Sequence, residues 1–366
     1  MNISEVAKRA KVSTATVSRT INGKGVVRPE TAERVWDVVH ALGYHPNTHA
    51  RALVSGRSQL LGLIISDITN PFFPELVKSF EQVALKHGFE IIVANTGYDP
   101  ERMSHCVRRM LERKVDGVAV FTSEMEEGLI AQLEERRIPI VFLDTGQVRN
   151  RISNIKVDYE KGIHEAIEHL FHLKHQRIAF ISGPLELRSA QIRRTAFLKW
   201  LDHYQLLLDD HLIETGNHKI EGGEAAMLRL LALTRRPTAV LASNDLTAIG
   251  ALRAIYSANL RVPDDISVIG YDDIDFSRFT QPALTTVRLS RSELADKALE
   301  ALTAVIGQKT VSGREFLVGT ELIVRGSTTE NRENPAEFSQ MPEGMSENEQ
   351  RQPLVSVSGR LPVLTK

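Results

Sequence analysis

Small polar side chains near the N-terminus, followed by an arginine, are the first residues whose types and spacing suit recognition chemistry. Arg19 offers a guanidinium that can bond one guanine through two hydrogen bonds, and a small residue such as Ala15 allows close approach or contacts a thymine methyl group. Hydroxyl groups and helix amino ends can hold phosphates. These chemistries predict a set of residues that contacts DNA: Ser13, Thr14, Ala15, Thr16, Ser18, Arg19 and Asn22. The alternative is a structural helical bundle with a solvated basic face.

A second candidate contact with DNA lies in the stretch 47–58. Ala50–Val54 can form one short helix that presents Leu53 beside Arg51 and Arg57. An apolar wedge with basic neighbours is what the kinking of a minor groove requires. Arg51 and Leu53 are therefore predicted to contact DNA. The alternative is a plain linker.

Three short helical segments must position these side chains. A first helix is predicted to follow Ser4, and Ser13 is the predicted N-cap of a second helix that glycines end. Pro29 fits the first turn of a third helix, which Gly43 closes. Two helices joined by a turn of a few residues, with a third behind them, form a helix-turn-helix unit, and we assign it to residues 1–46.

Charge is distributed unevenly along the 366 residues. Residues 1–57 hold nine basic and four acidic side chains, a net charge of +5, whereas residues 58–366 carry a net charge of −6. A basic head on an acidic body favours contact between the head and a polyanion. The single cysteine excludes an intramolecular disulfide framework, and no apolar stretch is long enough to span a bilayer. We therefore expect a cytoplasmic protein with no membrane partner.

Beyond residue 58 the pattern changes to short apolar runs separated by amphipathic helices. Alternating strands and helices predict a doubly wound parallel sheet, and so many strands predict two α/β lobes that bind ligands at the carboxyl ends of their strands. The predicted strands are 60–65, 90–96, 117–122, 139–144, 177–183, 238–244 and 266–272. Residues 331–366 contain four prolines and Phe338 as their only aromatic residue, so we predict a disordered tail there.

The run ISEVAKRAKVSTATVSRTINGKGVVRPETAERVWDVVHALGYHPNTHARAL resembles the DNA-binding head and hinge of the LacI/GalR family of repressors. The similarity continues through LLGLIISDITNPFF, VDGVAVF, RPTAVLASNDLTAIGAL, RVPDDISVIGYDDI and QPALTTV to about residue 328. This resemblance implies a hinge at 47–58 and a two-lobed body at 59–330 that is similar to a periplasmic sugar-binding protein. It also implies homodimers, or tetramers, on a pseudopalindromic operator in double-stranded DNA.

In such repressors, paired hinge helices insert a leucine into the central minor groove, and Leu53 matches that leucine. Thr14, Ala15 and Arg19 match the family's main base-reading positions. Two departures concern DNA contact. Ala15 is small where some members carry an amide, and Val54 follows the wedge where some relatives place lysine.

The resemblance also implies a pocket for a small effector, such as a sugar or sugar derivative, between the lobes. The residues that it implies as effector-binding are Ser66, Asp67, Phe72, Phe73, Asp144, Arg193, His218, Asn244 and Asp272. Strand-end carboxylates, an amide and a buried arginine around a cleft suit a hydroxyl-rich or anionic molecule. The alternative for each residue is a strand-end cap or a salt bridge between lobes. Leu187 is apolar where a purine-binding relative has arginine, which argues against a purine effector.

A sugar-modifying enzyme is the competing class of function. The sequence contains no GxxxxGK[ST] phosphate loop and no GxGxxG fingerprint. His164 and His169 come close to an HExxH zinc motif, but their i,i+5 spacing places them on different helix faces. Asp272 and Asp273 resemble an acidic catalytic cluster that a pocket rim explains equally well. We therefore expect an allosterically controlled transcriptional regulator, most simply a repressor, with no cofactor, no metal and no catalytic residue.

Overall fold

The computed structural model of the chain describes residues 2–22, 25–44, 57–122, 125–146, 148–308 and 311–332. It divides into two compact units. One comprises residues 1–60 with Lys114–Asp116, and the other comprises the rest. The predicted hinge helix, with Arg51 and Leu53, lies outside the described residues, and so do the tail residues 333–366.

The N-terminal unit is a small helical bundle with its own core. Its helices are α1 (Ile3–Ala10), α2 (Thr14–Asn22) and α3 (Pro29–Leu42). Their shared core consists of the buried residues Val6, Ala7, Ala10, Val17, Val35 and Val39. In addition, the Arg34 Nε group of α3 donates a hydrogen bond of 3.0 Å to the Ala10 carbonyl oxygen at the end of α1. The unit therefore combines apolar packing with a side-chain hydrogen bond that joins α1 and α3.

The ends of these helices test the predicted caps. Ser13 caps α2 as predicted, because its Oγ accepts a hydrogen bond of 3.1 Å from the Thr16 N–H. Gly43 ends α3 in a left-handed conformation with φ 56°. The predicted start of the first helix after Ser4 is wrong: α1 begins at Ile3, and the Asn2 side chain accepts from the Glu5 N–H. Asparagine is as good an N-cap as serine, so the cap moves two residues toward the N-terminus.

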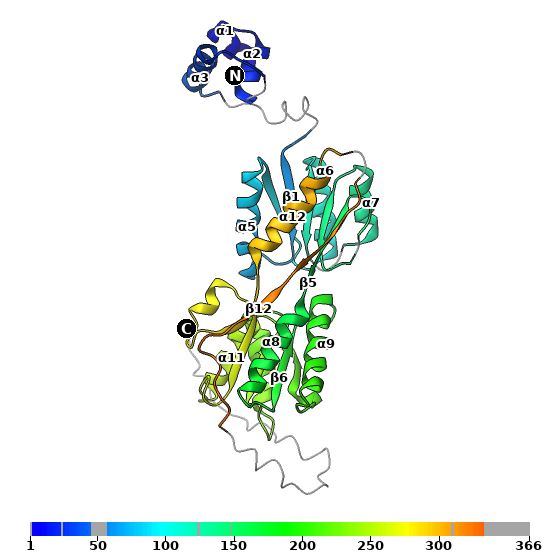
Figure 1. Cartoon of the computed structure of the whole chain (residues 1–366), viewed down its shortest axis with the longest axis vertical. Helices are drawn as coiled ribbons and strands as arrows, with labels where there is room; N and C mark the ends of the chain where they lie inside the picture. The colour runs from blue at the N-terminus through cyan, green and yellow to red at the C-terminus, as the bar shows by residue number, and fades with distance from the viewer. Residues whose placement is uncertain are drawn as a thin grey trace, which may run out of the picture. The chain divides into compact units, whose positions relative to one another are not determined.

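The first lobe of the body is a sheet in the strand order β11-β5-β4-β3-β1-β2. The β11–β5, β5–β4, β4–β3 and β3–β1 pairs are all parallel. Its strands are β1 (Leu60–Ile65), β2 (Glu90–Asn95), β3 (Gly117–Phe121), β4 (Ile140–Leu143), β5 (Ile152–Val157) and β11 (Glu315–Val318). Its helices are α5 (Phe72–Lys86), α6 (Pro100–Glu112), α7 (Glu127–Glu135) and α12 (Arg291–Val305). Helix α12 packs beside α5 (Figure 1).

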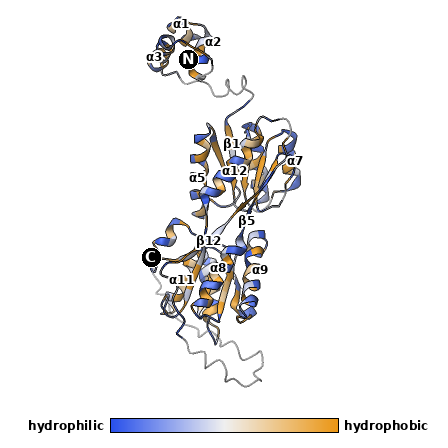
Figure 2. Ribbon diagram, viewed as in Figure 1, coloured by the Kyte–Doolittle hydropathy of each residue, from blue (hydrophilic) through white to orange (hydrophobic). Residues whose placement is uncertain are grey.

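The second lobe is a sheet in the order β12-β10-β9-β8-β6-β7, parallel except for the β12–β10 pair. Its strands are β6 (Ile178–Ser182), β7 (Ile213–Thr215), β8 (Ala239–Ala242), β9 (Ser267–Asp272), β10 (Thr285–Leu289) and β12 (Thr320–Ile323). Its helices are α8 (Tyr159–His172), α9 (Arg188–His203), α10 (Ile220–Leu231) and α11 (Asp245–Ser257), with the 3₁₀ turns η1 (Asp210–Leu212) and η2 (Asp275–Arg278). Figure 2 shows the apolar residues concentrated in the strands, as expected for sheets covered on both faces.

The chain passes between the lobes after β5, after β10 and again between β11 and β12. The last passage is the orange-brown strand that runs from one sheet into the other in Figure 1. All seven predicted strand runs are strands, and the predicted two-lobed α/β class is confirmed. The strands β5, β7, β10, β11 and β12 were missed, because they are short or carry inward-facing polar residues such as Ser153, Asn154 and Thr286, which hide the apolar run.

The C-terminal end of the body is tied to the second lobe. The Asn331 backbone N–H donates a hydrogen bond of 2.8 Å to the Leu173 carbonyl oxygen just after α8. The His175 ring nitrogens lie 2.9 Å from the Thr238 hydroxyl and 3.0 Å from the Thr329 carbonyl oxygen. The packed structure therefore includes Asn331, the first residue of the predicted tail.

Candidate functional site

Helix α2 presents the predicted DNA-contacting residues on its outer side. Thr14, Ala15 and Arg19 are exposed, whereas Val17 is buried against α1 and α3. Ala15 and Arg19 are one helical turn apart and therefore share a face. The amino end of α2 is open to a partner, which is the geometry of a recognition helix that enters a major groove.

Two of the predicted residues also have a structural task. The Ser13 hydroxyl caps α2 and lies 2.9 Å from the Thr16 hydroxyl. Thr16 and Ser18 are half-buried, and the Asn22 side chain lies outside the described structure. The most exposed chemistry is therefore that of Thr14, Ala15 and Arg19, since Ser13 and Thr16 already hold the helix start.

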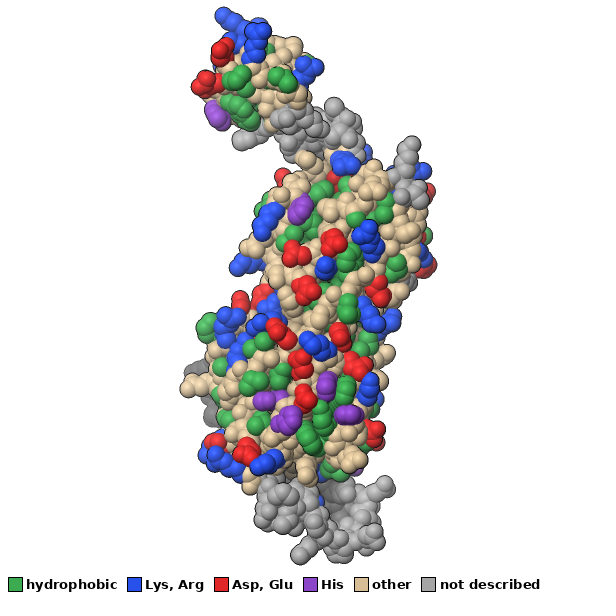
Figure 3. Space-filling view, viewed as in Figure 1, with side chains coloured by type: hydrophobic (Ala, Val, Ile, Leu, Met, Phe, Trp, Pro, Cys, Tyr) green, Lys and Arg blue, Asp and Glu red, His purple; other side chains and the backbone are tan. Residues whose placement is uncertain are grey.

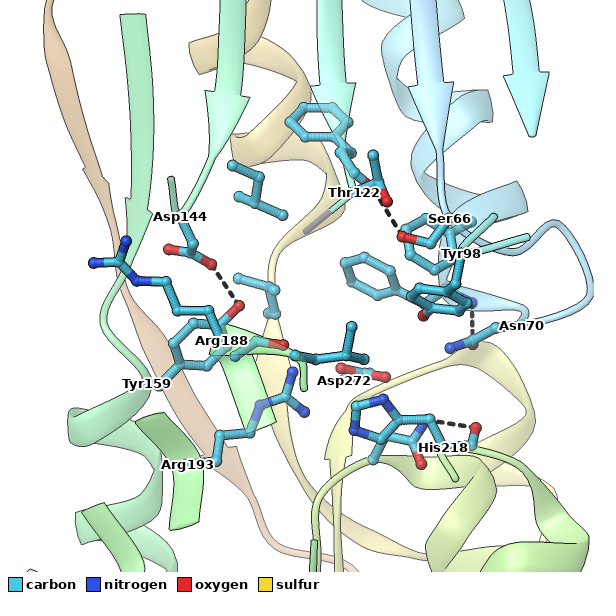
Figure 4. A pocket seen from close by; sticks show the side chains of 18 residues that line it. Ser66, Asn70, Tyr98, Thr122, Asp144, Tyr159, Arg188, Arg193, His218 and Asp272 are labelled. Atoms are coloured by element: carbon cyan, nitrogen blue, oxygen red, sulfur yellow. Dashed lines mark hydrogen bonds between the residues drawn. The ribbon is translucent and has the colours of Figure 1, made fainter. Parts of the chain in front are cut away.

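A polar pocket lies in the body where the carboxyl ends of both sheets meet helix starts. It encloses about 740 Å³, a figure that includes its opening to solvent. The lining comprises Ser66, Asn70, Phe72, Phe73, Tyr98, Phe121, Thr122, Leu143, Asp144, Tyr159, Leu187, Arg188, Ser189, Arg193, His218, Asn244, Asp272 and Leu289. Figure 4 shows Ser66, Tyr98 and Thr122 on the first-lobe side and Arg193, His218 and Asp272 on the second-lobe side.

Arg193 is the only arginine among the pocket-lining residues that is buried, with 7% of its surface exposed. Its guanidinium carbon lies 4.9 Å from the centre of the Tyr159 ring and 4.6 Å from that of Tyr271, so two aromatic faces hold the cation. One terminal nitrogen donates to the Ser243 carbonyl oxygen, while Nε finds no hydrogen-bond partner among the described residues. The Nε atom is itself covered by protein atoms, so what Arg193 offers a ligand in the pocket is its positive charge and its terminal nitrogens.

Asp272 ends β9 in a left-handed backbone conformation, with φ 110°. Burial raises the pKa of this carboxyl to about 7, although the positive charges of Arg193 and Arg291 lower it. Near neutral pH the Asp272 carboxyl therefore populates both its protonated and its ionised form, so the same group can donate or accept a hydrogen bond.

Asp144 also has a left-handed backbone, with φ 60°, and lies at the end of β4. Its two carboxylate oxygens accept hydrogen bonds from the Val157 N–H at 2.8 Å and the Tyr159 hydroxyl at 2.6 Å. Burial raises the pKa of Asp144 against these bonds. Asp144 thus lines the pocket and also holds the segment between β5 and α8. It combines the two roles that the sequence left open, ligand contact and a structural cap at a strand end.

His218 and Asn244 form the floor of the pocket on the second-lobe side. The Asn244 Oδ1 accepts from the Thr247 N–H at 2.9 Å, and its Nδ2 donates to the His218 carbonyl oxygen at 3.0 Å. The Nε2 end of the imidazole lies against Gly183, where an added Cβ would come within 1.9 Å of the His218 Nε2 atom. Burial, with a smaller effect from Arg193, lowers the pKa of His218 to about 3, so the ring is neutral.

Asp67 is the predicted effector residue that the pocket does not include. Its Oδ1 accepts from the Thr69 N–H at 2.9 Å and from the Thr69 hydroxyl at 2.7 Å, so this carboxylate holds the turn after β1. The other predicted effector residues all line the pocket. They come from strand ends and helix starts that are far apart in sequence.

Tyr98 and Tyr159 line the pocket but were not predicted from sequence. Tyr98 lies two residues after the predicted strand 90–96, and this position at a strand end was the sequence signal that could have placed it in the pocket. In the structure its backbone is left-handed, with φ 61°. Tyr159 begins the helix that follows β5, a strand that was itself missed. Arg188, which was also not predicted, lines the pocket, and its Nη1 donates a hydrogen bond of 3.1 Å to the Thr145 carbonyl oxygen.

Metal binding has no support in the described part of the chain, where no group of three or more metal-ligating side chains occurs. The histidines of the near-miss zinc motif are engaged elsewhere: His164 Nε2 lies 3.0 Å from the Tyr204 hydroxyl, and His169 Nε2 lies 3.0 Å from the Thr328 hydroxyl. Across the same described ranges, no helix is both long enough and apolar enough to cross a bilayer.

A helix-turn-helix unit and a two-lobed α/β body with a polar pocket, on one polypeptide, define a class of protein: ligand-responsive regulators of transcription. Family models agree with each part. Residues 2–47 match the model described as bacterial regulatory proteins, lacI family, and residues 167–328 match the periplasmic binding protein-like domain.

Relatives and solved structures match almost the whole chain. The chain is 35% identical over 326 residues to the HTH-type transcriptional repressor PurR of Mannheimia succiniciproducens, covering 89% of this chain and 98% of the relative, and 36% identical over 330 residues to PurR of Erwinia tasmaniensis, covering 90% and 97%. The crystal structure of the Lac repressor dimer bound to operator and the anti-inducer ONPF superposes with a TM-score of 0.77 and 29% identity over 90% of this chain and 99% of that one.

Two sugar complexes are also similar. A LacI family regulator from Enterococcus faecium with bound ribose has a TM-score of 0.66 and 29% identity, covering 75% of this chain and 100% of that one. The complex of the transcriptional regulator CelR with cellobiose has a TM-score of 0.67 and 27% identity over 89% and 99%. The chain therefore belongs to the lacI family of bacterial regulatory proteins, and it is a DNA-binding transcriptional regulator under small-molecule control.

Proposed function

We propose that this regulator represses transcription from an operator read by α2 and that a hydroxyl-rich small molecule in the pocket, a sugar or sugar derivative, controls it. The observation that carries the proposal is the pairing of Arg193 and Asp272 in one buried pocket. Arg193 brings a buried positive charge with several N–H donors, and Asp272 can donate or accept at neutral pH. Vicinal hydroxyls of a sugar, each both donor and acceptor, complement these two groups.

The rest of the pocket supports a molecule with polar edges and an apolar face. Phe72 and Phe73 form an aromatic corner, with ring centres 5.4 Å apart, that can pack against C–H groups. His218 adds a neutral imidazole ring to the lining, with its Nε2 atom against Gly183. Leu187 lines the mouth as an apolar residue, which disfavours the planar, heteroatom-rich edge of a purine.

Control follows from linkage between the pocket and the DNA-binding unit. A ligand that binds one arrangement of the lobes more tightly shifts the protein toward that arrangement, and the affinity for DNA changes by the reciprocal factor. We propose that the protein acts as a homodimer in the cytoplasm, where one recognition helix from each copy reads a half-site of a pseudopalindrome. The proposed parts are a DNA-binding unit at 1–46, a hinge at 47–58 that carries Arg51 and Leu53, and a body from 59 to about 330.

Binding without turnover is part of the proposal. Asp144 uses both carboxylate oxygens in the bonds to Val157 and Tyr159, and Asn244 uses both ends of its amide in structural bonds. Glycoside hydrolysis uses a pair of carboxyl groups, and Asp144, the other carboxyl in the lining besides Asp272, is engaged in these bonds. A sugar-modifying enzyme would instead convert the bound compound, which chromatography after incubation detects.

The test of the effector is a thermal-shift screen of sugars, sugar acids, sugar phosphates and purines. A ligand that binds only the folded protein raises its melting temperature by mass action. We expect a hydroxylated compound to raise the melting temperature of the wild-type protein and to leave that of Arg193→Ala unchanged. Stabilisation by purine bases alone would contradict the sugar proposal and restore the competing effector class.

The test of the DNA function is selection of duplexes from a random pool by the full-length protein. We expect a pseudopalindrome to be enriched and the selected duplex to bind more tightly than random DNA of equal length. A pool that shows no enrichment at moderate salt would contradict sequence-specific repression.

A further inference from the structure

Asp116 holds the point where the body begins. It lies in the loop between α6 and β3, and both of its carboxylate oxygens accept hydrogen bonds from the residues that precede β1. Oδ1 accepts from the Ser58 N–H at 3.0 Å and the Ser58 hydroxyl at 3.3 Å, and Oδ2 accepts from the Gln59 N–H at 2.8 Å. Bonds from N–H groups to a carboxylate are among the stronger hydrogen bonds in proteins.

These bonds fix the backbone conformation of Ser58 and Gln59, the two residues before β1. Gln59 has a left-handed conformation, φ 58°, which is costly for a residue with a side chain unless its surroundings hold it. The Ser58 hydroxyl accepts from the Leu60 N–H at 3.2 Å, and the Asp116 N–H donates to the Leu60 carbonyl oxygen at 2.8 Å. The path of the chain as it enters β1 therefore depends on the Asp116 carboxylate.

The same carboxylate stands at the amino ends of two strands whose carboxyl ends reach the pocket. Strands β1 and β3 pair in parallel, from Leu61 opposite Gly117 to Ile65 opposite Phe121. Ser66 directly follows β1, and both Ser66 and Phe121 line the pocket. Each strand is about 17 Å long, which is the span that separates its two ends. A shift of these strand ends on ligand binding would move the anchor at their other ends.

We propose that Asp116 is a positioning residue for DNA binding: it fixes the direction in which the chain leaves β1 toward the DNA-binding unit. This inference rests on the proposed DNA-binding function. Two recognition helices that must reach two half-sites at one spacing bind tightly only if each is held from a defined point. Loss of the anchor therefore lowers affinity for a paired site more than affinity for random DNA, which needs no fixed spacing.

The chain offers a matched control in the same lobe. Asp99 caps α6, and its Oδ1 accepts from the Glu101 N–H at 2.8 Å and the Arg102 N–H at 3.2 Å. Asp116→Asn and Asp99→Asn remove the same charge and weaken a comparable pair of backbone bonds. Only the first of these substitutions touches the residues that lead to the DNA-binding unit.

The experiment measures binding of full-length wild type, Asp116→Asn and Asp99→Asn to the duplex selected by the wild type and to random DNA of equal length, by fluorescence anisotropy. We expect Asp116→Asn to lower the ratio of selected to random affinity by about tenfold, and Asp99→Asn to leave the ratio within about twofold of the wild type. Melting temperatures of all three proteins separate a loss of stability from a loss of positioning.

An unchanged affinity ratio in Asp116→Asn would overturn the inference, and so would equal losses in both variants. If Asp116→Asn fails to fold, Ser58→Ala removes the hydroxyl bonds alone and is expected to lower the ratio by about twofold, with no change in the ratio again overturning the proposal. A wild-type protein that enriches no duplex would instead refute the proposed function itself.

Discussion

The proposed DNA-reading surface and the proposed effector pocket are built in opposite ways. The surface is a few neighbouring residues on α2, exposed on a helix whose start is capped by its own Ser13. The pocket gathers side chains from the carboxyl ends of β1, β3, β4, β9 and β10 and from the starts of α5, α8, α9 and α11. On a contiguous exposed surface, one residue can be substituted without changing the positions of the others. The positions of the pocket residues, in contrast, depend on how the whole body folds.

The two regions also differ in the solvent exposure of their charged side chains. Arg19 is exposed to solvent, and on the face drawn in Figure 3 acidic and basic side chains are interspersed over the body. Arg193 and Asp272 are buried, where charge interactions are stronger and unpaired groups are costly. Substitutions in the pocket are therefore expected to have larger effects than substitutions on α2, and the following predictions test this order.

Arg193→Ala is expected to have the largest effect. Removing a buried cation that two aromatic rings hold deprives a ligand of its strongest donor, at a cost of about 3–5 kcal/mol in ligand binding. Isothermal titration with a compound that stabilises the wild type measures this loss. The affinity of the same variant for random DNA should stay at the wild-type level, and a parallel loss would mean that the two regions are not independent.

Asp272→Asn is expected to change the pH dependence of stability. Because the folded protein raises the pKa of Asp272 from 3.8 to about 7, the folded state holds this proton more tightly than the unfolded state. Stability from this group is fully present below about pH 4 and is lost as the pH rises to about 7, by about 4 kcal/mol.

His218 acts in the opposite sense over part of that range. Its lowered pKa stabilises the neutral form, and this contribution is lost as the pH falls below 6.5. The measurement is therefore the difference in unfolding free energy between wild type and Asp272→Asn at several pH values. A difference that does not change between pH 4 and pH 8 would contradict the raised pKa.

Arg19→Ala is expected to weaken binding to the selected duplex by about 1–3 kcal/mol and to relax sequence choice at one base pair. Arg9→Ala is the control, because Arg9 is an exposed arginine on α1 whose guanidinium lies 3.9 Å from Glu5. Repeating the selection with both variants identifies the base pair. Equal losses without a change in sequence preference would mean that Arg19 contacts phosphate only.

Asn2→Ala is expected to have the smallest effect, about 1 kcal/mol in the stability of the N-terminal unit. The Asn2 side chain caps α1, and its loss removes one of two acceptors of the Glu5 N–H, which still donates to the Asn2 carbonyl oxygen at 3.1 Å. Ser4→Ala, two residues on, should change stability little. Chemical denaturation of the two variants, followed by helical circular dichroism, compares the caps directly, and a larger loss for Ser4→Ala would contradict the observed cap.

Much of the fold could be predicted from local pattern. The buried runs 60–65, 117–122 and 266–272 are strands because apolar runs of that length fit a sheet covered on both faces. The strand β5 escaped because Ser153 and Asn154 break its apolar run, and these polar residues are buried because they bond to the neighbouring strand segment near Arg314 and Glu315. The hydrogen bonds that allow Ser153 and Asn154 to be buried come from residues about 160 positions further along the chain, so local pattern does not reveal them.

The candidate pocket was predicted in part for the same reason. Most predicted effector residues line it, but Asp67 turns to Thr69 and holds a loop, although its position after a strand is like that of Asp144. Two carboxylates in equivalent local patterns thus have different surroundings. Tyr159 was missed because its place in the pocket depends on the passage from β5 into α8.

The sequence by itself determined the helix-turn-helix unit, most strand positions and the alternation that makes an α/β body, because these depend on periodicity and caps within a few residues. Only the tertiary structure decided which strand ends meet, that the chain passes repeatedly between the lobes, and that Asp116 holds the residues before β1. Such contacts join residues far apart along the chain, and their free energy comes from burial and hydrogen bonds that exist only once both lobes are folded.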